Sequence, residues 1–105
     1  IVRGTTSKRL VKILKDAGVK EIHFRSVSPP IIAPCYLGID TPSKDYLISA
    51  NMSVEELRDY LGVNSLEFLS MDNLKVILGS SNHCFGCFTE EYPVPAGPNP
   101  DYTDE

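Results

Sequence analysis

The chain has 105 residues, of which 42% are hydrophobic and 23% charged, so it is long enough for one domain with a hydrophobic core. Its formal charge of −4 argues against nucleic-acid binding, and no apolar run reaches the roughly 18 residues of a membrane-spanning helix. The first residues also lack the layout of a signal peptide, so we expect a soluble, cytoplasmic protein without a nucleic-acid or membrane partner.

The charges are divided unevenly along the chain. Residues 1–25 carry seven basic and two acidic side chains, a net charge of +5, whereas the remaining eighty residues have a net charge of −9. This division favours a small anion bound near the amino-terminal end over a long phosphate backbone, which needs a basic stripe across the surface. A lysine-rich helix face that only contacts solvent explains the pattern equally well.

The opening run Ile1–Ser7 leads directly into an amphipathic helix. Apolar residues at helical spacing predict this helix from Lys8, with Thr6 or Ser7 as its N-cap and Gly18 as its C-terminal cap; the apolar positions are Leu10, Val11, Ile13, Leu14 and Ala17. A glycine lets the backbone approach a ligand, and hydroxyls and amides at a helix N-terminus can donate to phosphate oxygens. The run is therefore either a phosphate-binding loop or a simple helix cap.

Strands and helices then alternate along the chain. Residues 20–27 predict a short strand, and a proline-rich stretch holds Cys35 in an extended loop. Asp40 and Thr41 are expected to cap a turn around Pro42. A loop followed by a helix and a strand is the second half of a βαβ unit, so we expect an α/β fold whose first strand precedes Ile1, in a chain cut at its amino end.

The second half of the chain continues this alternation. Ser53 and Glu56 form the pattern of a capping box for a helix that ends at Gly62. Residues 65–70 predict a short strand, and residues 71–78 a third helix that ends at Gly79. The remaining residues after Cys87 are rich in proline and acidic side chains, which is typical of an extended tail.

The three cysteines are Cys35, Cys84 and Cys87, an odd number that would leave one thiol over in a disulfide framework. Two thiolates separated by two residues, one of them a glycine, can bind one metal ion or cluster. A redox pair is expected at the start of a helix after a strand, whereas this pair follows a polar run. The spacing therefore favours a metal or cluster, and His83 leaves open a zinc site of three cysteines and one histidine.

The runs IVRGTTS, SPPI, PC, GIDTP, SVEE, YLG and C-x-x-C-F followed by YPV occur in an order and at a spacing that resemble the carboxy-terminal part of the amidophosphoribosyltransferase family. The resemblance extends from Ile1 to about Val94. It implies the carboxy-terminal portion of a type I phosphoribosyltransferase fold, a parallel sheet flanked by helices, with the sheet incomplete here. On this basis residues 1–79 belong to the phosphoribosyltransferase domain, residues 80–94 form a cluster-binding segment, and residues 95–105 form a flexible tail.

The resemblance also implies an activity. Members of the family make 5-phosphoribosylamine from phosphoribosylpyrophosphate and glutamine-derived ammonia, the first step of purine (IMP) biosynthesis, with Mg²⁺ bound alongside the substrate. They are glycosyltransferases with glutamine amidotransferase activity, form homotetramers, respond to inhibitory purine nucleotides, and work in plastids in plants. No catalytic residue is expected in this chain, and these residues alone are expected to be inactive.

The resemblance also assigns binding roles to individual residues, by matching each one to a position in the family's motifs. The 5-phosphate loop corresponds to Arg3, Gly4, Thr5, Thr6 and Ser7. In one branch of the family four cysteines hold a 4Fe–4S cluster that ties segments of the subunit together, and Cys35, Cys84 and Cys87 match three of them, with the fourth expected upstream of this chain. The alternatives are a stand-alone zinc-binding or interaction module that uses His83, and a phosphate-sugar binder without a cluster.

Overall fold

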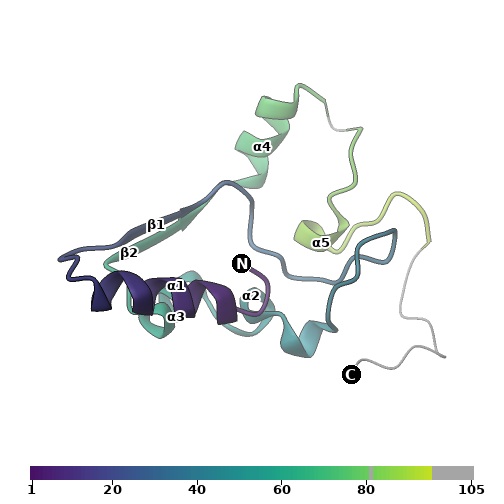
Figure 1. The fold of residues 1–105 in the computed structure, drawn as a ribbon. Coiled ribbons are helices and arrows are strands. Elements are labelled where there is room, and N and C mark those ends of the chain that lie inside the picture. Colours follow the sequence, from purple (N-terminus) through teal and green to yellow (C-terminus); the bar gives the residue numbers. More distant parts are fainter. Residues whose placement is uncertain (81, 96–105) are drawn as a thin grey trace.

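The computed structural model describes residues 1–80 and 82–95 (Figure 1). Its elements in chain order are α1 (Thr5–Asp16), β1 (His23–Ser26), the 3-10 turn η1 (Lys44–Tyr46), α2 (Ile48–Asn51), α3 (Val54–Leu61), β2 (Ser65–Phe68), α4 (Met71–Leu78) and α5 (Gly86–Thr89). None of the helices among these residues is both long enough and apolar enough to cross a membrane.

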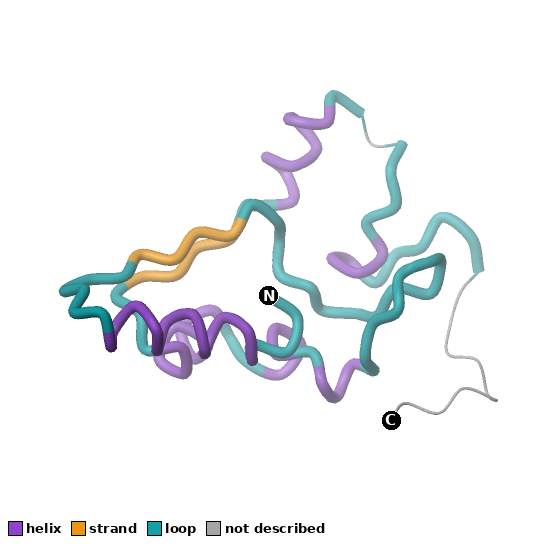
Figure 2. The backbone as a smooth tube through the Cα atoms, in the orientation of Figure 1, coloured by secondary structure: helices purple, strands orange, loops and turns teal. Residues whose placement is uncertain are grey.

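The two strands pair in parallel, with Phe24 opposite Leu66 and Ser26 opposite Phe68 (Figure 2). Parallel neighbours need a crossover connection, and here it contains η1, α2 and α3. The expected α/β class is therefore confirmed, and the described residues contribute two strands to the sheet. The strand predicted over residues 65–70 ends at Phe68, because Ser70 is the N-cap of α4.

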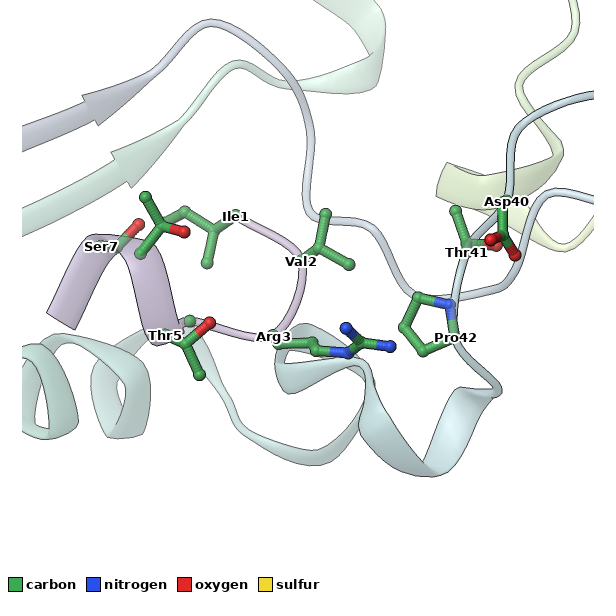
Figure 3. A pocket seen from close by; sticks show the side chains of 10 residues that line it. Ile1, Val2, Arg3, Thr5, Ser7, Asp40, Thr41 and Pro42 are labelled. Carbon is green, nitrogen blue, oxygen red and sulfur yellow. The ribbon is translucent and has the colours of Figure 1, made fainter. Parts of the chain in front are cut away.

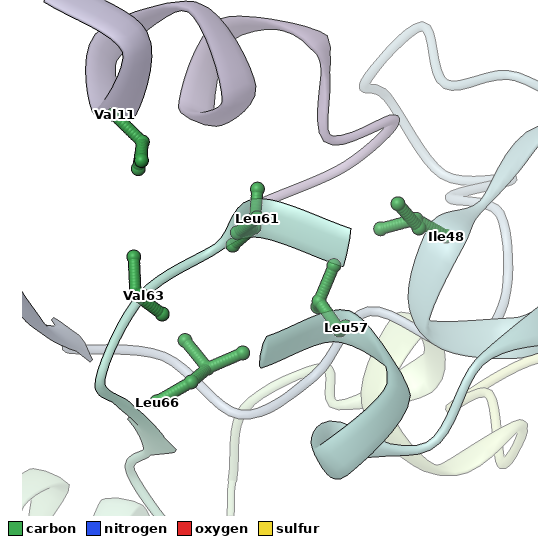
Figure 4. Close-up of a cluster of buried hydrophobic side chains, with 6 residues drawn as sticks. All are labelled: Val11, Ile48, Leu57, Leu61, Val63 and Leu66. Carbon is green, nitrogen blue, oxygen red and sulfur yellow. The ribbon is translucent and has the colours of Figure 1, made fainter. Parts of the chain in front are cut away.

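The core lies between α1, α3 and the sheet. Its buried members are Val11, Ile48, Leu57, Leu61, Val63 and Leu66 (Figure 4). Full burial of one such side chain contributes about 1.5–3 kcal/mol, so this small set holds α1 and α3 against the strands. Val11 is the buried residue of α1, whereas Leu10 and Ile13 remain 46% and 59% exposed. Of the predicted apolar positions of this helix, Val11 is therefore the one buried in the core, because α3 lies on its side.

Helix ends follow the predictions at α3 and α4. The Ser53 side chain accepts the Glu56 N–H while the Glu56 carboxylate accepts the Ser53 N–H, so the predicted capping box is confirmed. Gly62 ends α3 with a left-handed φ of 73°, and Gly79 ends α4 in the same way with a φ of 69°.

Two predicted caps are wrong. Helix α1 begins at Thr5 with Gly4 as its N-cap, so Thr6 and Ser7 lie in the first turn instead of preceding it. Asp40 and Thr41 cap no turn around Pro42, since residues 39–43 form neither a turn nor a helix and η1 begins at Lys44. The physical reason at Thr41 is a competing partner, because its hydroxyl accepts the backbone N–H of Cys35.

The carboxy-terminal elements lie away from the core (Figure 1). Helix α4 contains no buried residue, and α5 then returns to the loop that connects β1 with η1. The segment predicted over residues 80–94 contains α5, and most of the tail predicted over residues 95–105 lies outside the described residues.

Candidate functional site

A pocket of about 580 Å³ opens at the N-terminus of α1 (Figure 3). Residues 1–7 form one side of it, and residues 40–42 form the other. All five residues of the predicted phosphate loop, Arg3 to Ser7, therefore line one cavity. That this cavity holds phosphate stays a prediction.

Gly4 determines how the chain enters this pocket. Its φ of +82° is a left-handed conformation that side chains disfavour, and a Cβ atom here would lie 2.6 Å from Ile48 Cδ1. The Gly4 carbonyl accepts the N–H of Lys8 at 2.9 Å, which starts the helical hydrogen bonds. A side chain at this position would be strained by the left-handed φ and would require the Ile48 side chain to move.

The first turn of α1 has no side-chain cap, in contrast to α3 and α4, whose N-caps are serine side chains. The first backbone N–H groups of a helix have no intrahelical acceptor, and the helix dipole adds partial positive charge there. These amides, the hydroxyls of Thr5, Thr6 and Ser7, and the guanidinium of Arg3 together supply donors and positive charge to the pocket. The arrangement suits a small anion such as phosphate.

Sequence reasoning missed the opposite wall of the pocket. Asp40, Thr41 and Pro42 lie across from Arg3 (Figure 3), although Asp40 and Thr41 were expected only to cap a turn around Pro42. The run GIDTP, one of the motifs that carry the family resemblance, was the signal that could have placed them here.

The other basic residues of α1 do not line this pocket. The Lys8 ammonium donates to the Tyr60 carbonyl and lies 4.3 Å from the centre of the Tyr60 ring, and Lys15 Nζ lies against Gly62. Both lysines thus sit at the carboxyl end of α3, where cations stabilise the exposed carbonyls. Lys12 pairs with Asp16 at 3.1 Å on the surface. Part of the positive charge of residues 1–25 therefore stabilises α1 and α3 and does not lie at the pocket.

Cys35 lies in a loop whose backbone turns around its sulfur. The N–H of Ile39 donates to Cys35 Sγ at 3.4 Å, and the N–H of Cys35 itself donates to Thr41 Oγ1 at 2.8 Å. The backbone N–H groups of Ile39 and Leu37 lower the pKa of the Cys35 thiol, because they stabilise its thiolate form. Thr41 also lines the pocket, so one side chain joins the cysteine loop to the candidate anion site.

Cys87 approaches this loop from α5. Its carbonyl accepts the N–H of Ile32 at 2.8 Å and that of Ala33 at 3.1 Å. Burial raises the pKa of the Cys87 thiol, and negative charge on Cys35 and Cys84 raises it further. Cys84 is exposed two residues before α5, so the pair does lie at the start of a helix, although a short one that follows a loop instead of a strand.

Within residues 1–80 and 82–95, no group of three or more His, Cys, Asp or Glu side chains is arranged to hold a metal ion. The imidazole of His83 instead faces the Phe85 ring, with 6.2 Å between the ring centres. The cysteines of an iron–sulfur cluster are spaced by the cluster itself and bind separate iron atoms.

Curated relatives match the chain over most of its length. It is 58% identical over 96 residues to amidophosphoribosyltransferase 2, chloroplastic, from Arabidopsis thaliana, which covers 90% of this chain and 17% of the relative. It is 50% identical over 98 residues to the amidophosphoribosyltransferase of Archaeoglobus fulgidus, covering 90% of this chain and 21% of the relative. The chain thus spans about a fifth of the length of these relatives. No family model matches it.

Solved structures agree with these relatives. The chain superposes with a TM-score of 0.82 and 43% identity on the glutamine phosphoribosylpyrophosphate amidotransferase of B. subtilis complexed with ADP and GMP, over 98% of this chain and 24% of that one. A structure described as the allosteric regulatory enzyme of purine biosynthesis gives a TM-score of 0.83 at 44% identity, over 92% of this chain and 22% of that one. Over the segment that it spans, the chain is therefore similar in sequence and structure to amidophosphoribosyltransferases and has part of a type I phosphoribosyltransferase fold.

Proposed function

We propose that the chain supplies the 5-phosphate site of an amidophosphoribosyltransferase, which makes 5-phosphoribosylamine from phosphoribosylpyrophosphate and glutamine in the first step of purine (IMP) biosynthesis. The observation that carries this proposal is the uncapped first turn of α1, which opens on a pocket lined by Arg3, Gly4 and the three hydroxyl residues after it. The similarity to relatives with this activity in their names supports it.

In this function the residues of the pocket bind and orient the substrate. The backbone amides and the hydroxyls of Thr5, Thr6 and Ser7 donate to the oxygens of the 5-phosphate, and Arg3 offsets part of its charge. A fixed phosphate fixes the ribose, so that ammonia approaches the anomeric carbon as pyrophosphate leaves. Mg²⁺ enters with the pyrophosphate of the substrate, and no side chain of this chain acts as a nucleophile or general base.

The three cysteines are proposed to hold a 4Fe–4S cluster, with a fourth cysteine from outside this chain. The donor chemistry fits, because the three thiols come from two adjacent segments and amide N–H groups stabilise the Cys35 thiolate. When bound, the cluster supplies a structural tie between these segments and no redox step. The alternative, a stand-alone zinc-binding or interaction module, is not favoured, because the chain matches amidophosphoribosyltransferases over most of its length.

Regulation is proposed from the same relatives, and assembly from the family resemblance of the sequence. One solved relative is complexed with ADP and GMP, and another is described as an allosteric enzyme, so we propose that purine nucleotides inhibit this protein. We also propose a homotetramer. The relatives from Arabidopsis thaliana and Glycine max are chloroplastic, which favours a plastid if the source is a plant and the cytoplasm otherwise.

Calorimetric titration with ribose 5-phosphate tests the phosphate site. Arg3→Gln and Thr6→Val remove a charge and a donor from the pocket, so the affinity should fall by about tenfold for the charged contact and less for the hydroxyl. Arg9→Gln is the matched control, because it removes the same charge from an exposed position of α1 outside the pocket. Equal losses at Arg3 and Arg9, or no loss at either, would contradict a local phosphate site.

A further inference from the structure

The peptide unit between Pro34 and Cys35 is held at both of its polar ends by side-chain hydroxyls. Its carbonyl, which belongs to Pro34, accepts the Tyr92 hydroxyl at 2.7 Å. Its N–H, which belongs to Cys35, donates to Thr41 Oγ1 at 2.8 Å. The two hydroxyls belong to different later segments of the chain, 58 residues after Pro34 and 6 residues after Cys35. The orientation of this peptide fixes the direction in which the Cys35 side chain leaves the backbone.

Packing holds the ring of Tyr92 in the position from which it donates. A Cβ atom on Gly86 would lie 2.3 Å from the Tyr92 ring, so the ring rests directly on the backbone between Cys84 and Cys87. Its other neighbour is Tyr36, the residue after Cys35, with 5.3 Å between ring centres and 52° between planes. Tyr92 therefore contacts both cysteine-bearing segments, and the Lys44–Glu90 ion pair joins the same two parts of the chain nearby.

We infer that Tyr92 and Thr41 are positioning residues that clamp the Pro34–Cys35 peptide and so set the place of Cys35 relative to Cys84 and Cys87. The purpose assigned to the clamp rests on the proposed function, in which the cysteines bind a cluster. The arrangement of the clamp rests on the contacts described above. Neither side chain binds the metal. A peptide that is hydrogen-bonded at both polar ends keeps its orientation without the cluster, so the clamp orders the ligand loop in advance and lowers the conformational cost of cluster binding.

Two conservative variants remove the clamp without removing the packing. Tyr92→Phe deletes the hydroxyl and keeps the ring on Gly86, and Thr41→Val deletes the acceptor and keeps the shape. Thr41→Ser retains a hydroxyl and should behave as the unsubstituted protein. Tyr46→Phe is the control for tyrosine replacement, since Tyr46 is an exposed residue of η1.

The first readout is the loaded centre in the full-length protein, purified without oxygen. Iron and sulfide content, the magnetic resonance spectrum of the reduced cluster and the half-life of its absorbance in air are measured for each variant. We expect Tyr92→Phe and Thr41→Val to change the spectrum and to shorten the half-life by about fivefold, the effect of losing one hydrogen bond. Thr41→Ser and Tyr46→Phe should change neither.

The second readout is hydrogen exchange over residues 32–41 in the same protein after the metal is removed with a chelator. The amides of Cys35 and Ile39 should lose about fivefold in protection in Tyr92→Phe and Thr41→Val. Loaded variants with an unchanged spectrum and half-life would overturn the inference. If the unsubstituted protein holds no iron and sulfide, the proposed cluster is wrong. In that case the exchange experiment alone tests the clamp: lost protection in Tyr92→Phe and Thr41→Val supports it, and unchanged exchange in both variants overturns it.

Discussion

Gly4→Ala is the substitution for which the structure gives the sharpest expectation. Two costs add at this position. The φ of +82° places alanine in the left-handed region, which costs about 1–2 kcal/mol. The new methyl group would also lie 2.6 Å from Ile48 Cδ1, and overpacking of this kind costs about 1–3 kcal/mol. We therefore expect the free energy of unfolding to fall by about 2–5 kcal/mol.

A matched glycine separates these two costs. Gly18 follows the other end of α1 with a φ of +94°, and a Cβ atom there would meet nothing within 4 Å. Gly18→Ala should therefore carry only the backbone cost. Ile48→Val removes the clashing Cδ1 atom, so the double variant Gly4→Ala with Ile48→Val should regain about 1–3 kcal/mol relative to the sum of the single variants.

Urea unfolding followed by circular dichroism measures all four proteins, and ribose 5-phosphate titration follows the pocket in parallel. Gly4→Ala should weaken phosphate binding, because the left-handed φ of Gly4 is strained for alanine and its relaxation moves the first turn of α1. Equal losses of stability in Gly4→Ala and Gly18→Ala, or strict additivity with Ile48→Val, would refute the argument that Gly4 is required by close packing.

Three further predictions follow from the structure. Ser53→Ala removes the capping-box hydroxyl of α3 and should cost about 1 kcal/mol in urea unfolding, and a neutral result would show that water replaces the cap. Leu57→Ala removes a core side chain that is 1% exposed and should cost about 2–5 kcal/mol, whereas Leu78→Ala, at a position 41% exposed, should stay within about 0.5 kcal/mol. Residues 1–105 alone, supplied with phosphoribosylpyrophosphate, Mg²⁺ and ammonia, should form no phosphoribosylamine, and measurable product would contradict the purely binding role proposed for them.

The features that could be predicted from the sequence are those that depend on residues close together in the chain. The capping box at Ser53, the glycines that end α3 and α4, and the two short strands depend on residues a few positions apart, so their signals are complete within one stretch of sequence. The family motifs likewise pointed to the five residues at the start of α1. These are now seen to line one pocket.

Only the tertiary structure decided which partner each of several residues takes. The helical spacing of α1 allowed several apolar faces, and the position of α3 made Val11 the buried one. Thr41 had a plausible local role as a cap, but the chain folds so that its hydroxyl meets the amide of Cys35. Tyr92 belongs to the YPV run of the family resemblance, but its contact could not be predicted, because its partner Pro34 is 58 residues away in sequence. A sequence specifies the options of a side chain through its neighbours, and long-range packing then selects among them.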